Sequence, residues 1–133
     1  MENSHNHLHF ICTGYVNEAP NEAGVQFLND WFRRMVQAIG MKVLIEPNSI
    51  YCGTEGNEGL TGLVCIETSH SSIHFWSKPT PFFKFDLYSC KHFDELGVIE
   101  LLREFGLKEV TYTTIDRNDD LNPVINSGQV FFN

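Results

Sequence analysis

The stretch that decides the fold runs from Gly59 to Trp76 and reads GLTGLVCIETSHSSIHFW. Apolar residues continue as far as Ile66, a polar corner follows at residues 68–71, and a run rich in apolar and aromatic residues returns to Trp76. Two such runs joined by a short polar corner are typical of a β-hairpin. The corner gathers several hydroxyl groups and an imidazole, and taken alone it indicates a turn whose side chains bond to nearby backbone groups.

Outward from this hairpin, short strands and two helices follow one another along the chain. Strands are predicted over residues 7–15, 41–45, 60–67, 72–77, 82–88 and 108–114. Residues 24–39 repeat apolar positions at steps of three and four, which predicts a helix that stops at Gly40. Residues 94–105 show the same period, with Asp94 as a candidate N-cap and Gly106 as a stop. This order predicts an α+β two-layer sandwich, in which an antiparallel sheet carries both helices on one face.

A single domain is expected over residues 1–116, because the whole chain of 133 residues is close to the commonest domain size. Residues 117–133 form a mainly polar tail, which we expect either to be loose or to pack on a neighbouring molecule. Two helices cover only one face of such a sheet, and Phe83, Phe85 and Leu87, or the residues alternating with them, would occupy the other. An apolar second face is typically buried against another sheet, so the sequence predicts a homodimer.

The composition favours a cytoplasmic protein that acts on a small molecule. Seventeen Asp and Glu against nine Lys and Arg give a formal charge of −8, which disfavours nucleic-acid binding. No stretch approaches the ~20 apolar residues that cross a bilayer, and the first residues lack the features of a signal peptide. The four cysteines show no C-x-x-C spacing, so neither a zinc site nor a disulfide framework is indicated.

Three ordered motifs carry a resemblance to a known family. They are Thr61-Gly62, then SHSSIHFW from Ser69 to Trp76, and then Asp86-Leu87-Tyr88-Ser89-Cys90. In this order and spacing they resemble the processing and active-site segments of the prokaryotic-type, pyruvoyl-dependent S-adenosylmethionine decarboxylases. The resemblance in length and strand order extends over residues 7–115.

This resemblance implies that the chain cuts itself between Thr68 and Ser69. The Oγ of Ser69 would attack the carbonyl carbon of Thr68, and elimination from the resulting ester followed by hydrolysis would leave a pyruvoyl group at position 69. His74 would act as the acid and base of this processing, and the hydroxyl of Thr61 would stabilise the tetrahedral intermediate.

The same resemblance implies the activity of the processed enzyme. The pyruvoyl ketone would form a Schiff base with the amine of S-adenosylmethionine and withdraw the electrons released as CO₂ departs. Cys90 would return a proton to the α-carbon, and the product would feed polyamine (spermidine) synthesis. The candidate substrate-binding residues are Glu67, Tyr51 and Trp76.

The sequence departs from the family pattern at three places, the first of which is the segment from Phe10 to Tyr15 in place of an N-terminal D-L-(Y/F)-G-C. Thr68 separates Glu67 from Ser69, whereas the family has Glu directly before the cleaved serine. Ser77-Lys78 replaces a Pro-Glu pair whose glutamate is expected to hold ribose hydroxyls, and a lysine has no acceptor for them. Two alternatives therefore stay open: a pyruvoyl decarboxylase of another amino acid such as arginine or ornithine, and an unprocessed, non-catalytic homologue.

The candidate residues also have purely structural interpretations. His74 is then a core histidine with satisfied hydrogen bonds, Cys90 packs at a strand end, and Thr61 is an ordinary β-branched strand residue. The remaining cysteines, Cys12, Cys52 and Cys65, are expected to be small buried hydrophobic residues.

Overall fold

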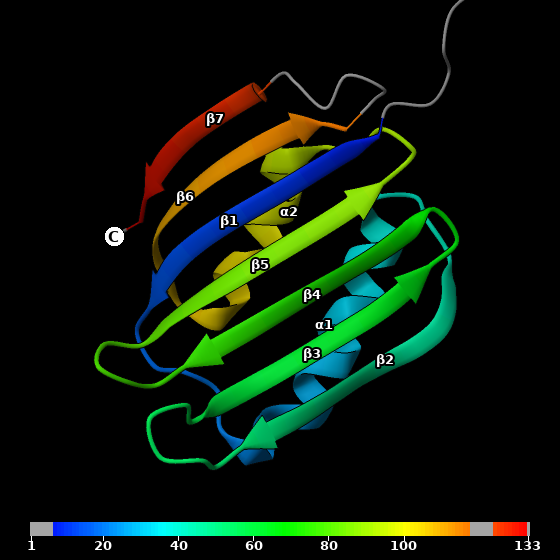
Figure 1. Cartoon of the computed structure of the whole chain (residues 1–133). Coiled ribbons are helices and arrows are strands. Elements are labelled where there is room, and N and C mark those ends of the chain that lie inside the picture. The colour runs from blue at the N-terminus through cyan, green and yellow to red at the C-terminus, as the bar shows by residue number, and fades with distance from the viewer. Residues whose placement is uncertain (1–6, 118–123, 133) are drawn as a thin grey trace, which may run out of the picture.

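A computed structural model describes residues 7–117 and 124–132 of the chain. Its centre is one seven-stranded antiparallel sheet with the strand order β2-β3-β4-β5-β1-β6-β7 (Figure 1). The strands are β1 Leu8–Val16, β2 Val43–Cys52, β3 Gly59–Ile66, β4 Ser69–Trp76, β5 Phe82–Ser89, β6 Leu107–Asp116 and β7 Val124–Phe131.

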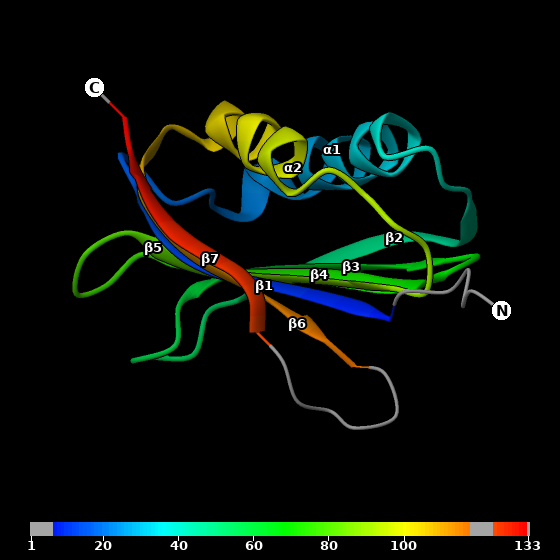
Figure 2. The same cartoon turned by 90° about the horizontal axis from the view of Figure 1, so that it is seen from above.

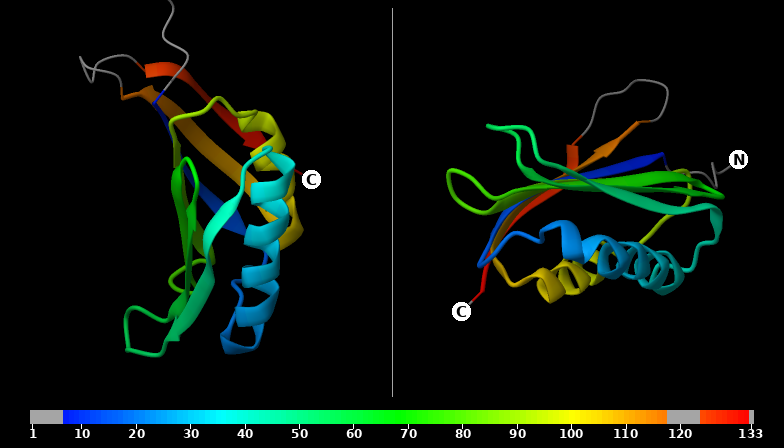
Figure 3. Two further views of the ribbon diagram at one scale, coloured as in Figure 1. Left: turned by 90° about the vertical axis from the view of Figure 1, so that its right-hand side faces the viewer. Right: turned by 90° about the horizontal axis from the view of Figure 1, so that it is seen from below.

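Both helices lie on the same face of this sheet (Figures 2 and 3). They are α1, Val25–Ala38, and α2, Glu95–Leu102, with a 3-10 turn at Glu22–Gly24 before α1 and another at Arg103–Phe105 after α2. The predicted α+β two-layer sandwich is therefore confirmed. Asp94 stands at the N-cap of α2 as predicted, but its side chain makes no capping hydrogen bond.

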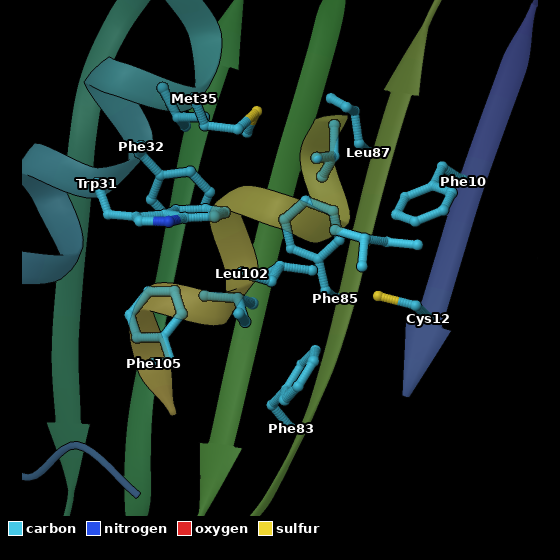
Figure 4. Close-up of a cluster of buried hydrophobic side chains, with 14 of the residues drawn as sticks. Phe10, Cys12, Trp31, Phe32, Met35, Phe83, Phe85, Leu87, Leu102 and Phe105 are labelled. Atoms are coloured by element: carbon cyan, nitrogen blue, oxygen red, sulfur yellow. The ribbon is translucent and has the colours of Figure 1, made fainter. Parts of the chain in front are cut away.

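The hydrophobic core fills the space between the helices and the sheet (Figure 4). Every second side chain of β1, β4 and β5 enters it, because successive strand residues point to opposite faces. Trp31 of α1 lies at its centre, with ring centroids 5.4 Å from Phe32, 6.0 Å from Phe85 and 5.1 Å from Phe105. The indole N–H of Trp31 donates to the carbonyl oxygen of Leu101 at 2.9 Å, which joins the two helices. The largest fully buried side chains are Trp31, Phe10, Phe32, Phe75, Phe83, Phe85, Leu28, Met35, Leu60, Ile66, Ile73 and Leu87.

Two strands have bounds that the sequence did not predict. β2 continues through Pro47 to Cys52 instead of ending at Ile45. It is an edge strand with register shifts on both sides of Ile45, and a residue without an N–H is tolerated at an edge. β4 begins at Ser69, three residues earlier than predicted, so the candidate cleavage serine is the first residue of a strand.

Part of the predicted tail forms the additional edge strand β7. It pairs with β6 in a register that joins Phe131 to Glu109 and Val124 to Ile115. Phe132, just after β7, lies beneath the guanidinium of Arg103, 4.7 Å from the ring centroid. Residues 124–132 therefore pack within their own chain, and the rest of the tail after residue 117 lies outside the described residues.

The second face of the sheet carries no helix in the described part of the chain (Figure 2). Phe83, Phe85 and Leu87 point into the core, so the residues alternating with them occupy this open face. The open face is consequently mixed, with Lys84 and Asp86 beside apolar side chains. Exposed apolar residues on this face include Ile11, Tyr15, Ile50 and Leu63.

Candidate active site

The candidate cleavage point lies in the tight turn between β3 and β4. Glu67 and Thr68 make the turn, and Ser69 opens β4 opposite Ile66 of β3. Ser69 has a φ of 155° and is the one non-glycine residue with a positive φ between residues 7 and 117. A residue with a Cβ rarely adopts such a φ, and the conformation costs of the order of 1–3 kcal/mol. The backbone at the predicted scissile bond is therefore strained.

Cys90 lies directly beside this scissile bond. Ser69 pairs with Ser89, the last residue of β5, and Cys90 is the next residue along the chain. The backbone N–H of Cys90 donates to the carbonyl oxygen of Thr68, with 3.1 Å between nitrogen and oxygen. An N–H aimed at this oxygen polarises the carbonyl that Ser69 would attack, as a donor in an oxyanion hole does.

Local hydrogen bonds hold the two segments that meet at this contact. The buried Oγ of Ser89 donates to the carbonyl oxygen of Lys91 at 2.9 Å and accepts from the Lys91 N–H at 3.0 Å. On the other segment, Thr68 Oγ1 donates to the sulfur of Met41 at 2.9 Å. These bonds fix the chain on both sides of the Cys90 N–H, so the donor keeps its aim at the Thr68 carbonyl.

The hydroxyl of Ser69 has an imidazole as its neighbour. Ser69 Oγ lies 3.0 Å from Nδ1 of His70, an exposed residue whose ring is tilted against Tyr88 with centroids 5.8 Å apart. A hydroxyl within hydrogen-bond distance of an imidazole nitrogen is the arrangement that activates serine nucleophiles. The sequence interpretation gave His70 no role, although its position next to the serine was an available signal.

His74 and Thr61 form a second polar group on the open face. They face each other across β3 and β4, with 2.7 Å between Thr61 Oγ1 and His74 Nδ1. The imidazole stacks on Trp76 with centroids 3.8 Å apart, and burial lowers the pKa of His74 below its ordinary value. Its Nε2 is buried and has no hydrogen-bond partner among the described residues. The histidine is therefore held neutral and fixed in orientation.

The structure does not bring these two groups together within one chain. His74 lies five residues beyond Ser69 on β4, which corresponds to ~16 Å at the rise of ~3.3 Å per strand residue. The odd spacing also assigns them to opposite rows of the strand, since His74 shares the open face with Ser72 and Ser69 belongs to the row of the buried Ser71. His74 and Thr61, to which the resemblance assigns the processing chemistry, therefore lie apart from Ser69 of the same chain.

The candidate substrate-binding residues are divided between the two ends of the sheet. Glu67 is exposed in the turn next to Ser69. Tyr51 and Trp76 lie at the C-terminal ends of β2 and β4, near the beginning of β3 and at the end of the sheet away from Glu67. Lys78 follows β4 beyond that same end of the sheet and is largely exposed. Of these residues, only Glu67 lies near the predicted cleavage point.

A polar cluster around Asp86 on the open face was not anticipated from the sequence. Asp86 of β5 accepts a hydrogen bond from Ser72 Oγ at 2.5 Å and lies 2.9 Å from His9 Nε2. Burial opposes the charged carboxylate, but His9 and Ser72 hold the pKa of Asp86 below its ordinary value. Together with Thr61 and His74, Asp86 lines a shallow pocket of about 370 Å³. These residues come from four strands, so no spacing within the sequence reveals the cluster.

The cysteines are all free thiols. Cys12 is buried as expected, and this burial raises the pKa of its thiol, whereas Cys52, Cys65 and Cys90 are only half-buried. Within the described ranges, no three side chains of Cys, His, Asp or Glu are placed to hold a metal ion. Neither described helix has the length and apolar character needed to cross a membrane.

The chain is thus an α+β protein with one antiparallel sheet and two helices on one face, and its β3–β4 turn places a strained serine beside a cysteine backbone amide. Comparison with known families is consistent with this geometry: the profile described as S-adenosylmethionine decarboxylase matches residues 9–118. Because the match covers most of the chain, the protein belongs to this family, and the predicted membership of the S-adenosylmethionine decarboxylases is confirmed. No curated protein sequence matches the chain.

Proposed function

We propose that this chain cleaves itself between Thr68 and Ser69 and then decarboxylates S-adenosylmethionine for polyamine synthesis. The observation that carries the proposal is the hydrogen bond from the Cys90 N–H to the Thr68 carbonyl oxygen, at 3.1 Å. It polarises the bond to be cleaved and brings the cysteine expected to act in decarboxylation to the residue expected to become the cofactor. The strained φ of Ser69 favours a reaction that breaks the peptide bond before it.

The residues at this turn fit a pyruvoyl group made from Ser69. Ser69 is half-buried at a strand end, and its neighbours Thr68 and Cys90 are anchored by their own hydrogen bonds. Once formed, the group supplies a ketone that accepts the amine of the substrate and takes up the electron pair left by CO₂. The half-buried thiol of Cys90 is the proton donor that this chain places nearby. The formal charge of −8 favours approach of the cationic sulfonium substrate.

Intact-mass spectrometry and denaturing gels test the self-cleavage. The wild-type chain of 15.2 kDa should convert into two fragments of nearly equal size, the second of which begins with a pyruvoyl group. Ser69→Ala is the matched control and should stay intact. A wild-type chain that keeps its full mass after prolonged incubation overturns the proposal and favours the non-catalytic homologue.

Cys90→Ala separates the two roles assigned to position 90. The backbone N–H that contacts Thr68 is still present in this variant, so self-cleavage should continue at close to the wild-type rate. The proton donor is lost, so CO₂ release should fall by about 10²–10⁴-fold. Equal loss of cleavage and decarboxylation would contradict this division between backbone and thiol.

A second candidate substrate is a basic amino acid such as arginine or ornithine. Lys78, which replaces the expected ribose-binding glutamate, lies 3.8 Å from the carboxylate of Glu58 and is 75% exposed. It therefore supplies no acceptor for ribose hydroxyls. Release of labelled CO₂ from S-adenosylmethionine, arginine and ornithine, each offered alone to the cleaved enzyme, decides between the substrates.

We further propose that the open face is the interface of a homodimer. Leu63 and Ile11, which are 55% and 39% exposed, lie on this face with no covering element from the described chain. Leu63→Lys should convert a dimer into a monomer in size-exclusion chromatography with light scattering. Leu96→Lys is the matched control, because Leu96 is 60% exposed on α2, in the helix layer. A monomeric wild type, or an equal effect of both variants, contradicts the interface.

A further inference from the structure

We propose that Arg117 binds the α-carboxylate of the substrate beside position 69, an inference that rests on the proposed function. The guanidinium of Arg117 lies over the ring of Tyr88, with 4.2 Å between Cζ and the ring centroid. Tyr88 of β5 pairs with His70 of β4, the residue that follows Ser69. Arg117 thus reaches from the end of β6 across β1 to β5, which is ~4.8 Å from β4 (Figure 1).

A chain of hydrogen bonds fixes the direction of this guanidinium. Nη1 of Arg117 lies 3.2 Å from Nδ1 of His9, and Nε2 of the same imidazole lies 2.9 Å from Oδ2 of Asp86. A guanidinium can only donate, so Nδ1 is the acceptor, and the proton of the neutral ring is on Nε2, which donates to the carboxylate. The backbone is also held, because the N–H of Arg117 donates to the carbonyl oxygen of His7 at 2.6 Å. Arg117 is therefore oriented before a ligand arrives.

The surroundings of Arg117 fit an anionic group. Three imidazoles, those of His7, His9 and His70, lie against the same Tyr88 ring, with centroids 6.3, 5.6 and 5.8 Å from it. This concentration of basic side chains contrasts with the formal charge of −8 on the whole chain. A guanidinium presents a fork of N–H donors that matches the two oxygens of a carboxylate, and it would repel a sulfonium. The carboxylate end of the substrate is therefore the end that fits here.

The inference holds for each candidate substrate, because S-adenosylmethionine, arginine and ornithine all carry an α-carboxylate. This carboxylate loses its charge as CO₂ departs, so the ion pair contributes to substrate binding rather than to the chemical step. Loss of the guanidinium should accordingly raise KM and leave kcat nearly unchanged. His9 is a positioning residue in this arrangement, because it acts on the substrate only through Arg117.

Two ligands that the enzyme does not turn over separate the carboxylate from the rest of the substrate. One is the decarboxylated amine, which lacks the carboxylate, and the other is the deaminated acid, which keeps it. Both are made from whichever of the three amino acids the wild type decarboxylates. Calorimetric titration of the cleaved enzyme gives the Kd of each ligand, and release of labelled CO₂ gives KM and kcat.

Arg117→Gln should raise KM and the Kd of the acid by about 10–100-fold, with the Kd of the amine unchanged. Arg117→Lys keeps the charge without the fork and should recover part of the loss. His9→Phe removes the acceptor that orients the guanidinium, so it should raise the same two constants by a smaller factor and spare the amine. Arg103→Gln is the matched control, because Arg103 also lies over an aromatic ring, 4.7 Å from the centroid of Phe132, but next to the helices.

Every variant should cleave itself as the wild type does, since the inference assigns Arg117 no part in cleavage. An active wild type with unchanged KM and acid Kd in Arg117→Gln overturns this inference and leaves the proposed function standing. An equal loss of affinity for the amine, or an Arg117→Gln chain that stays uncleaved, also overturns it. A wild type that stays uncleaved, or that decarboxylates none of the three amino acids, overturns the proposed function and this inference with it.

Discussion

Replacing Gly62 with alanine tests how closely helix α1 sits on the sheet. Gly62 of β3 faces the helix layer, where Leu28 and Phe32 of α1 and Ser49 of β2 surround it. A Cβ at position 62 would lie 2.7 Å from Leu28 Cδ2, 2.7 Å from Ser49 Oγ and 3.0 Å from Phe32 Cε2. Ordinary Cβ contacts are 3.4–4 Å long, so either α1 moves outward or these side chains leave their preferred rotamers.

The expected destabilisation follows from two opposing effects. Overpacking a core by one methyl group costs about 1–3 kcal/mol. Replacing a glycine with alanine also lowers the conformational entropy of the unfolded chain, which stabilises the folded protein by about 0.4–1 kcal/mol. Three close contacts, one of them with a Ser49 hydroxyl that is itself bonded to Asn29 at 2.6 Å, place the cost in the upper part of its range. The net loss in free energy of unfolding is then about 1–2 kcal/mol, or about 4–8 °C in Tm for a chain of this length.

Urea unfolding and thermal melting measure this loss, in a Ser69→Ala background that keeps the chain in one piece. Gly53→Ala is the matched control, because the nearest atom to its new Cβ is Tyr51 Cε2 at 3.8 Å. The Gly53→Ala variant should melt within about 2 °C of its parent, since such surface changes are usually within ±0.5 kcal/mol. If Gly62→Ala is as stable as Gly53→Ala, the close approach of α1 to β3 is refuted.

Three further changes test the polar contacts. Ser49→Ala leaves the buried Oδ1 of Asn29 without its hydrogen-bond donor, so the free energy of unfolding measured in urea should fall by about 1–3 kcal/mol. If Ser49→Ala costs the same in the wild type and in an Asn29→Ala background, the two residues are not coupled. Because the folded pKa of His74 is lowered from 6.5, protonation favours the unfolded chain, and the free energy of unfolding should fall as the pH drops below 6.5. His74→Phe should flatten the plot of urea midpoint against pH in this range. An unchanged slope in the variant would contradict this assignment to His74. The folded pKa of Asp86 is lowered from 3.8, so the stability that its carboxylate contributes is complete above pH 3.8 and is lost as the pH falls through the folded value. Asp86→Asn should therefore be less stable than the wild type at neutral pH, and the difference in stability should narrow in acid. A difference that stays constant with pH would contradict the stabilising role of this carboxylate.

The architecture was predictable because most strands and both helices bury one face. Alternation along β1 and β5 and the three- and four-residue period of α1 are direct consequences of that burial. The edges of the sheet were harder to predict. β2 carries Glu46-Pro47-Asn48, which is typical of a turn, yet an edge strand with an irregular register accommodates it. The polar residues 126–129 of β7 indicated a tail because an edge strand has little need for apolar sequence.

The candidate site was predictable only where motif order carried the information. The resemblance paired Ser69 with Cys90 across 20 intervening residues, and the backbone contact between Cys90 and Thr68 agrees with that pairing. The distance from Ser69 to His74 could have been anticipated, because an odd number of steps along a strand leads to the opposite face. The bond between Ser69 and His70 depends on the local geometry at a residue with positive φ, which no periodic pattern encodes.

The order of strands determines what a break after residue 68 would leave behind. One polypeptide would hold β1, β2 and β3, the other β4 to β7, and β1 is inserted between β5 and β6 of the second. Three ladders, β3 with β4, β1 with β5 and β1 with β6, would still cross from one polypeptide to the other. The two fragments would therefore be interleaved within one sheet. A severed backbone would leave an undivided protein, whose halves part only when the whole sheet unfolds.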